Sequence, residues 1–328
     1  MTTGASLLDR VGEREPLDGH DGRSGARLER VVLADGTRLV VKRTSPDVDL
    51  AMRLTGLDES REYRLWQAGV LDRLPAGLGH ALVGAWREGD ETVLVMRDLG
   101  GAVVGWDRRI SREECRRLLA AAESLHRTYA DHRPDGLVPL CDRVSLFAPA
   151  RMAGEVASGN PLPAAVLRGW ERFAELVDDE VAGAAFGVLD RPERLAGPLA
   201  SRPSTLIHGD LWLVNVALDA EQVTLLDWDL ATWAPPALDL AVFLHGNASQ
   251  VDAIRDEIVD DFRRLWGDEH DEVALRLALF AGLVDLGWNK ALDAAEHEDA
   301  AVRLREQADL DWWVAQARQT LELGLLDS

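Results

Sequence analysis

Two short apolar segments in the second half of the chain, each ending in polar residues, constrain the fold more than any other feature. They are LIHGDLWLVNV (residues 206–216) and VTLLDWD (residues 223–229). A short apolar run bounded by polar or turn residues is typical of a buried strand. Because Asp210, Asn215 and Asp227 follow such strands, we expect their side chains to face one another.

These three polar residues have the chemistry that phosphoryl transfer requires. Mg²⁺ prefers carboxylate, amide and phosphate oxygens as ligands. A further carboxylate can orient and deprotonate an attacking hydroxyl group. The two segments therefore predict a site for Mg²⁺, a triphosphate and an alcohol.

The first part of the chain is rich in strand signals. LERVVL (residues 28–33) and TRLVVK (residues 37–42) flank an Ala-Asp-Gly turn, and an Asp-Gly pair between β-branched runs is a strong hairpin signal. Apolar residues at helical spacing predict a helix over residues 59–71. Two more strands are expected over residues 80–87 and 92–97.

The pattern changes at Ser111. The segment SREE (residues 111–114) reads as a capping box that opens a helix through His126, and helical patterns dominate from there onward. We therefore expect an α+β chain of two lobes. Residues 1–98 form a small antiparallel sheet with one helix, and residues 99–328 form a larger, mainly helical lobe.

Charge and composition limit the partners. The net charge of −21 opposes binding to nucleic acid or anionic membranes, which require basic surfaces. It favours a cationic small molecule, although solubility explains it equally well. The apolar runs fall short of the roughly 18 residues that span a bilayer, and the N-terminus has no secretory signal, so we expect a cytoplasmic protein. The oligomeric state is not encoded in these patterns.

Two cysteines occur, Cys115 and Cys141. Neither belongs to a CxxC motif or a Cys/His cluster, so no disulfide framework or zinc site is predicted.

The pattern HGDxxxxN, followed by an apolar strand and DWD, resembles the catalytic and metal-binding segments of the aminoglycoside-phosphotransferase and choline-kinase superfamily. That superfamily shares the bilobal fold of the protein kinases, and its motifs are related to the kinase signatures HRDxxxxN and DFG. The resemblance implies that Asp210 acts as the catalytic base or positions the hydroxyl. It also implies that Asn215 and Asp227 bind Mg²⁺.

The residues around this motif resemble the same superfamily. His208 is similar to the structural histidine that braces the loop, with direct proton transfer as the alternative. Gly209 and Asp229 stand where protein kinases usually carry arginine and glycine, which favours the small-molecule branch. Asp239, in PPALD, is similar to the aspartate that caps the backbone of the catalytic loop, and an ordinary acid at a helix start is the alternative.

The resemblance also places ATP contacts in the first lobe. Lys42 closes an apolar strand after the hairpin, where the family's lysine meets the α- and β-phosphates. The expected partner of this lysine is Glu62 on the next helix, with Glu59 as the alternative.

Two further segments are expected to contact the nucleotide. The glycine-dense loop with Gly22 and Gly25 stands where the family's phosphate-covering loop belongs, although it lacks a GxGxxG pattern. The strand with Met96, and Asp98 just beyond it, resembles the approach to the hinge, where backbone groups bind the adenine edge.

Contacts to the acceptor are expected in the C-terminal helices. Asp285 and Trp288 lie three residues apart in GLVDLGWNKAL (residues 282–292) and share a helix face. An acid beside an aromatic ring can hold an ammonium group, with interhelix contacts as the alternative. Asp229 is a third candidate acceptor contact.

The sequence therefore predicts an O-phosphotransferase that uses ATP and Mg²⁺ and acts on a small, cationic molecule such as an antibiotic, an amino sugar or another metabolite. A pseudokinase without turnover is the alternative, but such proteins commonly lose the lysine, the base or the metal aspartate. A metal-dependent hydrolase is a third class, and it would need neither the hairpin lysine nor the hinge strand.

Overall fold

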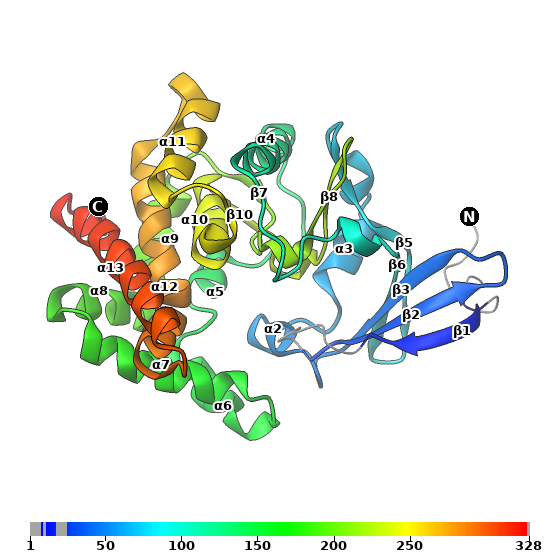
Figure 1. Ribbon diagram of the computed structural model, residues 1–328, viewed down its shortest axis with the longest axis horizontal. Helices are drawn as coiled ribbons and strands as arrows, with labels where there is room; N and C mark the ends of the chain where they lie inside the picture. Colours follow the sequence, from blue (N-terminus) through cyan, green and yellow to red (C-terminus); the bar gives the residue numbers. More distant parts are fainter. Residues whose placement is uncertain (1–7, 9–10, 18–24, 327–328) are drawn as a thin grey trace.

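An antiparallel sheet of five strands forms the smaller lobe (Figure 1). The computed structural model describes residue 8, residues 11–17 and residues 25–326. The strands lie in the order β1-β2-β3-β6-β5. Their bounds are β1 (Val11–Pro16), β2 (Arg27–Leu33), β3 (Arg38–Thr44), β5 (Leu82–Glu88) and β6 (Glu91–Arg97).

The predicted hairpin is confirmed as β2 and β3. Val32 pairs with Arg38, and the N–H of Gly36 donates to the carbonyl of Leu33, which closes the turn. The two faces of the sheet have different partners. Val31, Val41, Val93 and Val95 form a small core on one face, whereas Leu94 and Met96 on the other face join the main core of the molecule.

Two short helices connect β3 to the rest of this lobe. The side chain of Asp49 caps α2 (Leu50–Leu54), and the side chain of Ser60 caps α3 (Arg61–Gln67). Asp and Ser are favoured at this position because their oxygens accept free N–H groups of the first turn. The helix expected over residues 59–71 is therefore shorter, and α2 was not expected.

Two small sheets lie where the two lobes meet. In one, β4 (Leu78–His80), β9 (Val223–Leu225) and β8 (Val216–Leu218) lie side by side. In the other, β7 (Thr205–Ile207) pairs with β10 (Thr232–Ala234). The buried strands expected in the segments 206–216 and 223–229 are thus present as β7 and β9.

The larger lobe is helical, as predicted (Figure 1). The capping box of Ser111 and Glu114 opens α4 (Arg112–Thr128). The other helices are α5 (Leu140–Val144), α6 (Pro149–Glu155), α7 (Leu162–Leu176), α8 (Asp179–Asp190), α9 (Glu193–Ala200), α10 (Ala237–Asn247), α11 (Arg255–Trp266), α12 (Glu272–Glu296) and α13 (Ala300–Glu322). Helix α12 is buried on nearly all sides among α7, α10 and α13.

Short 3₁₀ turns join several of these elements. They are η1 (Leu71–Arg73), η2 (Gly100–Ala102), η3 (Val156–Ser158), η4 (Leu213–Asn215), η5 (Trp228–Leu230), η6 (Ala248–Gln250) and η7 (Gly267–Glu269).

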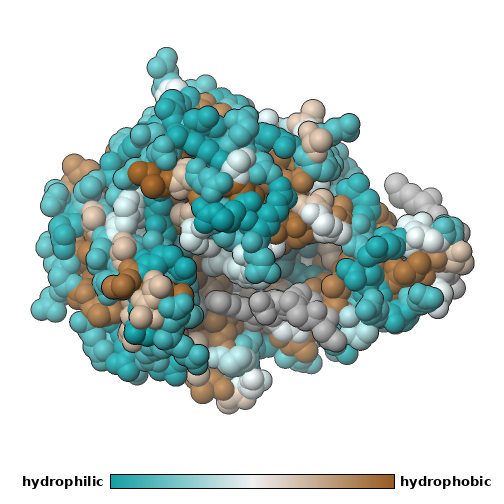
Figure 2. All heavy atoms as spheres, in the orientation of Figure 1, coloured by the Kyte–Doolittle hydropathy of each residue, from teal (hydrophilic) through white to brown (hydrophobic). Residues whose placement is uncertain are grey.

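The face shown in Figure 2 is mostly polar and is hollowed between the two lobes. Within the described ranges, no helix combines the length and the apolar character that crossing a lipid bilayer would require.

Candidate active site

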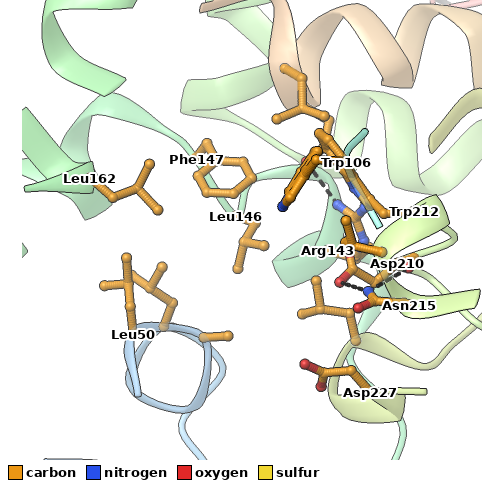
Figure 3. A pocket seen from close by; sticks show the side chains of 16 residues that line it. Leu50, Trp106, Arg143, Leu146, Phe147, Leu162, Asp210, Trp212, Asn215 and Asp227 are labelled. Carbon is orange, nitrogen blue, oxygen red and sulfur yellow. Dashed lines mark hydrogen bonds and ion pairs between the residues drawn. The ribbon is translucent and has the colours of Figure 1, made fainter. Parts of the chain in front are cut away.

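Asp210, Asn215 and Asp227 line one cavity of about 210 Å³ between the lobes (Figure 3). Asn215 comes directly before β8, and Asp227 follows β9. Because β8 and β9 are antiparallel, with Val216 opposite Leu225, the two side chains meet at the same end of the sheet. The Nδ2 atom of Asn215 donates to Oδ2 of Asp210 over 2.9 Å. The convergence expected from the sequence is thus present.

The backbone at Asp227 adopts a conformation that few side chains tolerate. Its φ of 61° is the single positive value found at a non-glycine residue in the described part of the chain. Such conformations cost energy and cluster at functional sites. Close by, burial and the negative charge of Asp227 raise the pKa of Asp210 to about 7.

Asp239 holds the backbone of the loop that carries Asp210. Its carboxylate accepts the N–H of His208 over 3.0 Å and the N–H of Gly209 over 2.8 Å. It also lies 2.9 Å from Nε2 of His126, which comes from α4. The expected capping role of Asp239 is confirmed.

His208 is fully buried between the loop and the strand that precedes Asp227. Its Nε2 lies 3.0 Å from the carbonyl of Leu226, and its Nδ1 accepts the N–H of Asp210 over 3.3 Å. The ring also packs edge-on against Trp228. Both nitrogens are engaged with the backbone, and His208 does not line the cavity, so the geometry favours the bracing role over proton transfer.

Gly209 has a structural reason to be glycine. Its φ is +77°, and a Cβ atom at this position would lie 2.1 Å from the carbonyl oxygen of Leu230. A larger residue would push the loop that carries Asp210 away from η5.

Lys42 reaches from β3 into a cluster of carboxylates. Its Nζ donates to Oδ1 of Asp227 over 3.0 Å and to Oδ2 of Asp229 over 3.1 Å. Burial alone would lower the pKa of Lys42, but these two carboxylates raise it well above its usual value. The lysine therefore stays charged beside the residue expected to bind metal.

Asp229, a predicted acceptor contact, makes its side-chain hydrogen bonds to residues of the smaller lobe. Its Oδ1 accepts hydrogen bonds from Oγ of Ser60 over 2.7 Å and from the N–H of Glu62 over 3.1 Å, at the start of α3. Burial would raise the pKa of Asp229, but Lys42 and these hydrogen bonds lower it to about 2. Asp229 therefore links Lys42 to α3.

The two glutamates expected near Lys42 lie in different places. Glu62 is buried close to Lys42, and its carboxylate groups with those of Asp227 and Asp229. Burial and these two acids raise the pKa of Glu62 to about 8. Glu59 instead pairs with Arg64 outside this cluster. Glu62 is thus the nearer glutamate, but Asp227 and Asp229 make the hydrogen bonds to Lys42.

The other residues expected at the nucleotide are dispersed. Gly22 lies outside the described residues, and Gly25 lines a second cavity next to the first. Met96 is buried at the end of β6. Asp98 pairs with Arg30 and Arg38 over 2.9 Å each, so its carboxylate connects the end of β6 to β2 and β3.

Asp285 lies in the cavity wall, but its charge is already paired. Arg143, from α5, makes two hydrogen bonds to it, of 2.8 and 3.0 Å, and a third to the carbonyl of Gly209. This geometry favours the alternative, interhelix contacts, over a joint ammonium site of Asp285 and Trp288. Trp288 is buried against Phe147 and lines the second cavity instead.

Sequence reasoning missed Arg143 and Ser60. Arg143 stands in a five-residue helix without a motif, so no local pattern indicates its role. Ser60 did carry a signal, because a serine directly before a helical pattern is a typical N-cap. Its second contact, to Asp229, could not be read from that signal.

Comparisons with known proteins agree with this geometry. The profile of the phosphotransferase enzyme family (APH) matches residues 21–276, well over half of the chain. No curated protein sequence matches the chain significantly.

Solved structures share the fold at low sequence identity. A microcompartment-associated aminopropanol kinase is 14% identical, with a TM-score of 0.53, and the match covers 97% of this chain and 94% of that one. A thermostable mutant of the aminoglycoside phosphotransferase APH(4)-Ia is 14% identical, with a TM-score of 0.52 and 97% of each chain covered. The choline kinase LicA from Streptococcus pneumoniae is 12% identical, with a TM-score of 0.51 and coverage of 94% and 95%. The chain belongs to the phosphotransferase enzyme family and is a phosphotransferase enzyme with the predicted bilobal, kinase-like fold.

Proposed function

We propose that this phosphotransferase transfers the γ-phosphate of ATP to a hydroxyl group of a small molecule, with Mg²⁺ as the metal. One observation carries the proposal: Asp210, Asn215 and Asp227 line the same cavity, with the buried ammonium group of Lys42 only 3.0 Å from Asp227. A base, two oxygen ligands and a phosphate-binding cation are the parts that phosphoryl transfer requires.

The donor atoms fit Mg²⁺ and a nucleotide. Nδ2 of Asn215 is engaged by Asp210, which leaves the amide oxygen of Asn215 as a metal ligand beside the carboxylate of Asp227. Asn215 and Asp227 would hold the metal, which would supply neutralisation of charge on the phosphate oxygens. Lys42 binds the phosphates from the N-terminal side, and the backbone beyond Met96 binds the base. In this assignment residues 1–98 hold the nucleotide and residues 99–328 supply the catalytic loop and the acceptor.

Asp210 performs the proton chemistry. Its carboxylate accepts the proton of the acceptor hydroxyl as the oxygen forms its bond to the γ-phosphorus. The bond from that phosphorus to the β–γ bridging oxygen breaks, and ADP leaves with the electron pair. Arg143 and Asp239 hold the backbone of residue 209 from two sides, so Asp210 keeps its position during the reaction.

The acceptor is proposed to be small because structures of the same fold are named as kinases of aminopropanol and choline and as an aminoglycoside phosphotransferase. The pseudokinase alternative is disfavoured because Lys42, Asp210, Asn215 and Asp227 are all present and converge.

The test measures ADP release by the purified protein with Mg²⁺, ATP and a panel of alcohols, amino sugars and antibiotics. Replacing Asp210 with alanine should lower turnover by about 10²- to 10⁴-fold while ATP affinity stays nearly constant. Asp227→Ala should also weaken binding of the metal–nucleotide complex. Undiminished turnover in the Asp210→Ala variant would refute the role of Asp210. Asp268→Asn, an exposed acid on η7, is the matched control and should leave both properties unchanged.

A further inference from the structure

The cavity beside Asp210 has two chemically different walls (Figure 3). Asp210, Asn215 and Asp227 lie on one side. The opposite side consists of aliphatic and aromatic side chains from α2, the connection between α5 and α6, and the start of α7. These side chains are Leu50, Leu146, Phe147 and Leu162. An acceptor whose hydroxyl faces Asp210 would therefore have its body against apolar groups.

Each charged side chain that lines this cavity is paired with another side chain or has a role in the proposed reaction. Among the described residues that line it, the ionisable ones are Arg143, Asp210, Asp227 and Asp285. Asp285 is paired with Arg143 through hydrogen bonds of 2.8 and 3.0 Å. Asp227 lies 3.0 Å from Lys42, and Asp210 faces the reacting hydroxyl. These residues thus leave no carboxylate for an ammonium group at the far wall.

The same lining selects against polyamines on physical grounds. An ammonium group loses its hydration when it enters a cavity, and the loss is recovered only through charge pairing and hydrogen bonds. The leucines of this wall offer neither, and the ring of Phe147 offers an ammonium group only a cation–π attraction. An apolar body gains free energy from the same burial. The net charge of −21 favours cations near the surface, but it does not describe the inside of this cavity.

A second cavity gives a larger acceptor room to continue. It has a volume of about 840 Å³ and shares Trp106 and Leu162 with the first. Trp106, which is 42% exposed, packs edge-on against Trp212 with ring centroids 5.7 Å apart. Asn289 and Asp293 line this second cavity, and Nδ2 of Asn289 donates to Oδ2 of the Asp293 carboxylate over 3.3 Å, so a cationic group is not excluded there.

We propose that the part of the acceptor next to the reacting hydroxyl is an uncharged apolar or aromatic body, which lies against the apolar wall of the first cavity. The inference rests on the proposed function, because it takes Asp210 as the position of the reacting hydroxyl. Within the first cavity it replaces the cationic group that net charge alone favoured.

The experiment compares matched alcohols that share a carbon skeleton and differ by one methyl-to-ammonium replacement, with an amino sugar and choline included. ADP release gives kcat/KM for each, and calorimetry gives binding to the protein without ATP. We expect kcat/KM to be at least 100-fold higher for the uncharged member of each pair. ADP release that favours the amino sugar, choline or the ammonium member would overturn the inference and support the phosphotransfer itself.

A variant tests the wall directly. Leu162 is the first residue of α7 and is partly exposed, so Leu162→Asp suits a helix N-terminus and should fold. It should reverse the preference within each pair by at least tenfold, whereas Leu162→Asn, which changes size but not charge, should not. Leu304→Asp, at a position 74% exposed on α13, is the control and should leave the preference unchanged.

The two hypotheses can fail separately. Saturable binding of uncharged alcohols, without ADP release from any acceptor, would overturn the proposed function and support the assignment of the cavity. No saturable binding by any uncharged alcohol would overturn the inference, whatever the turnover with other acceptors.

Discussion

The Nζ atom of Lys42 lies 3.1 Å from Oδ2 of Asp229, and the other oxygen of the same carboxylate accepts the N–H of Glu62 at the start of α3. One side chain from the larger lobe therefore orients the lysine of the sheet and caps the helix beside it. A carboxylate at a helix N-terminus is stabilised both by free N–H groups and by the helix dipole.

We expect Asp229→Asn to weaken ATP binding roughly tenfold, equivalent to about 1.4 kcal/mol. The amide keeps the size of the side chain but removes the charge that orients Lys42. Titration calorimetry with ATP and Mg²⁺ measures the effect, and Asp268→Asn is the exposed control. Unchanged ATP affinity in Asp229→Asn would show that Asp227 alone positions Lys42.

Gly209→Ala should inactivate the enzyme by about 100-fold or more, in the range for loss of a positioned catalytic group. The new Cβ would lie 2.1 Å from the carbonyl of Leu230, so the loop carrying Asp210 must move. Gly89→Ala is the matched control, because Gly89 has φ of +63° and nothing within 4 Å of its Cβ position. That control should lose only about 1–2 kcal/mol of stability and keep its activity. Equal kcat values for the two variants would contradict the steric argument.

Substitutions in the buried pair of Arg143 and Asp285 should have strongly non-additive effects on the free energy of unfolding. Asp285→Ala leaves a buried arginine without its partner and should lower the free energy of unfolding by about 3–5 kcal/mol. The double variant Arg143→Met/Asp285→Leu should recover most of that loss, since apolar side chains of similar size replace both charges. The kcat of the double variant should be lower than that of the wild type, because the hydrogen bond from Arg143 to Gly209 is gone. Urea denaturation tests this, and a double variant no more stable than the single one would contradict it.

The buried side chain of His245 should make the free energy of unfolding depend on pH. Burial and the positive charges of Lys290 and Arg255 lower its pKa well below the usual 6.5. Because the folded-state pKa is below the unfolded one, the unfolded state binds the extra proton. The contribution of neutral His245 to the free energy of unfolding is therefore fully present above about pH 6.5. It is lost as pH falls toward the folded-state pKa, by up to about 1.4 kcal/mol per pH unit.

Denaturation of wild type and His245→Leu between pH 7.5 and 5 measures this contribution, and the variant should show a smaller slope. His132→Leu, at an exposed position, should keep the wild-type slope. Parallel curves for wild type and His245→Leu would mean that His245 does not titrate differently in the two states.

Features set by neighbouring residues were predictable. The hairpin of β2 and β3 follows from an Asp-Gly turn between β-branched runs, and the capping box of α4 follows from Ser111 and Glu114. The strands before Asp210 and Asp227 follow from short apolar runs with polar ends. The helix after β3 was expected to be longer, and α2 was missed, because a helix of five residues has too few turns for a periodic pattern.

The sequence by itself determined the strand-rich first lobe and the helical second lobe, because turns, caps and short buried strands are encoded in local patterns, and its HGDxxxxN and DWD segments carried the family resemblance. Only the tertiary structure decided how the charges are paired: Lys42 and Asp229 are 187 residues apart, and Arg143 and Asp285 are 142 apart. The energy of such pairs depends on burial and on atomic distance, and neither is contained in the order of residues along the chain. For the same reason Asp285 could be read as an acceptor contact from the sequence, whereas the folded chain shows its carboxylate hydrogen-bonded to Arg143.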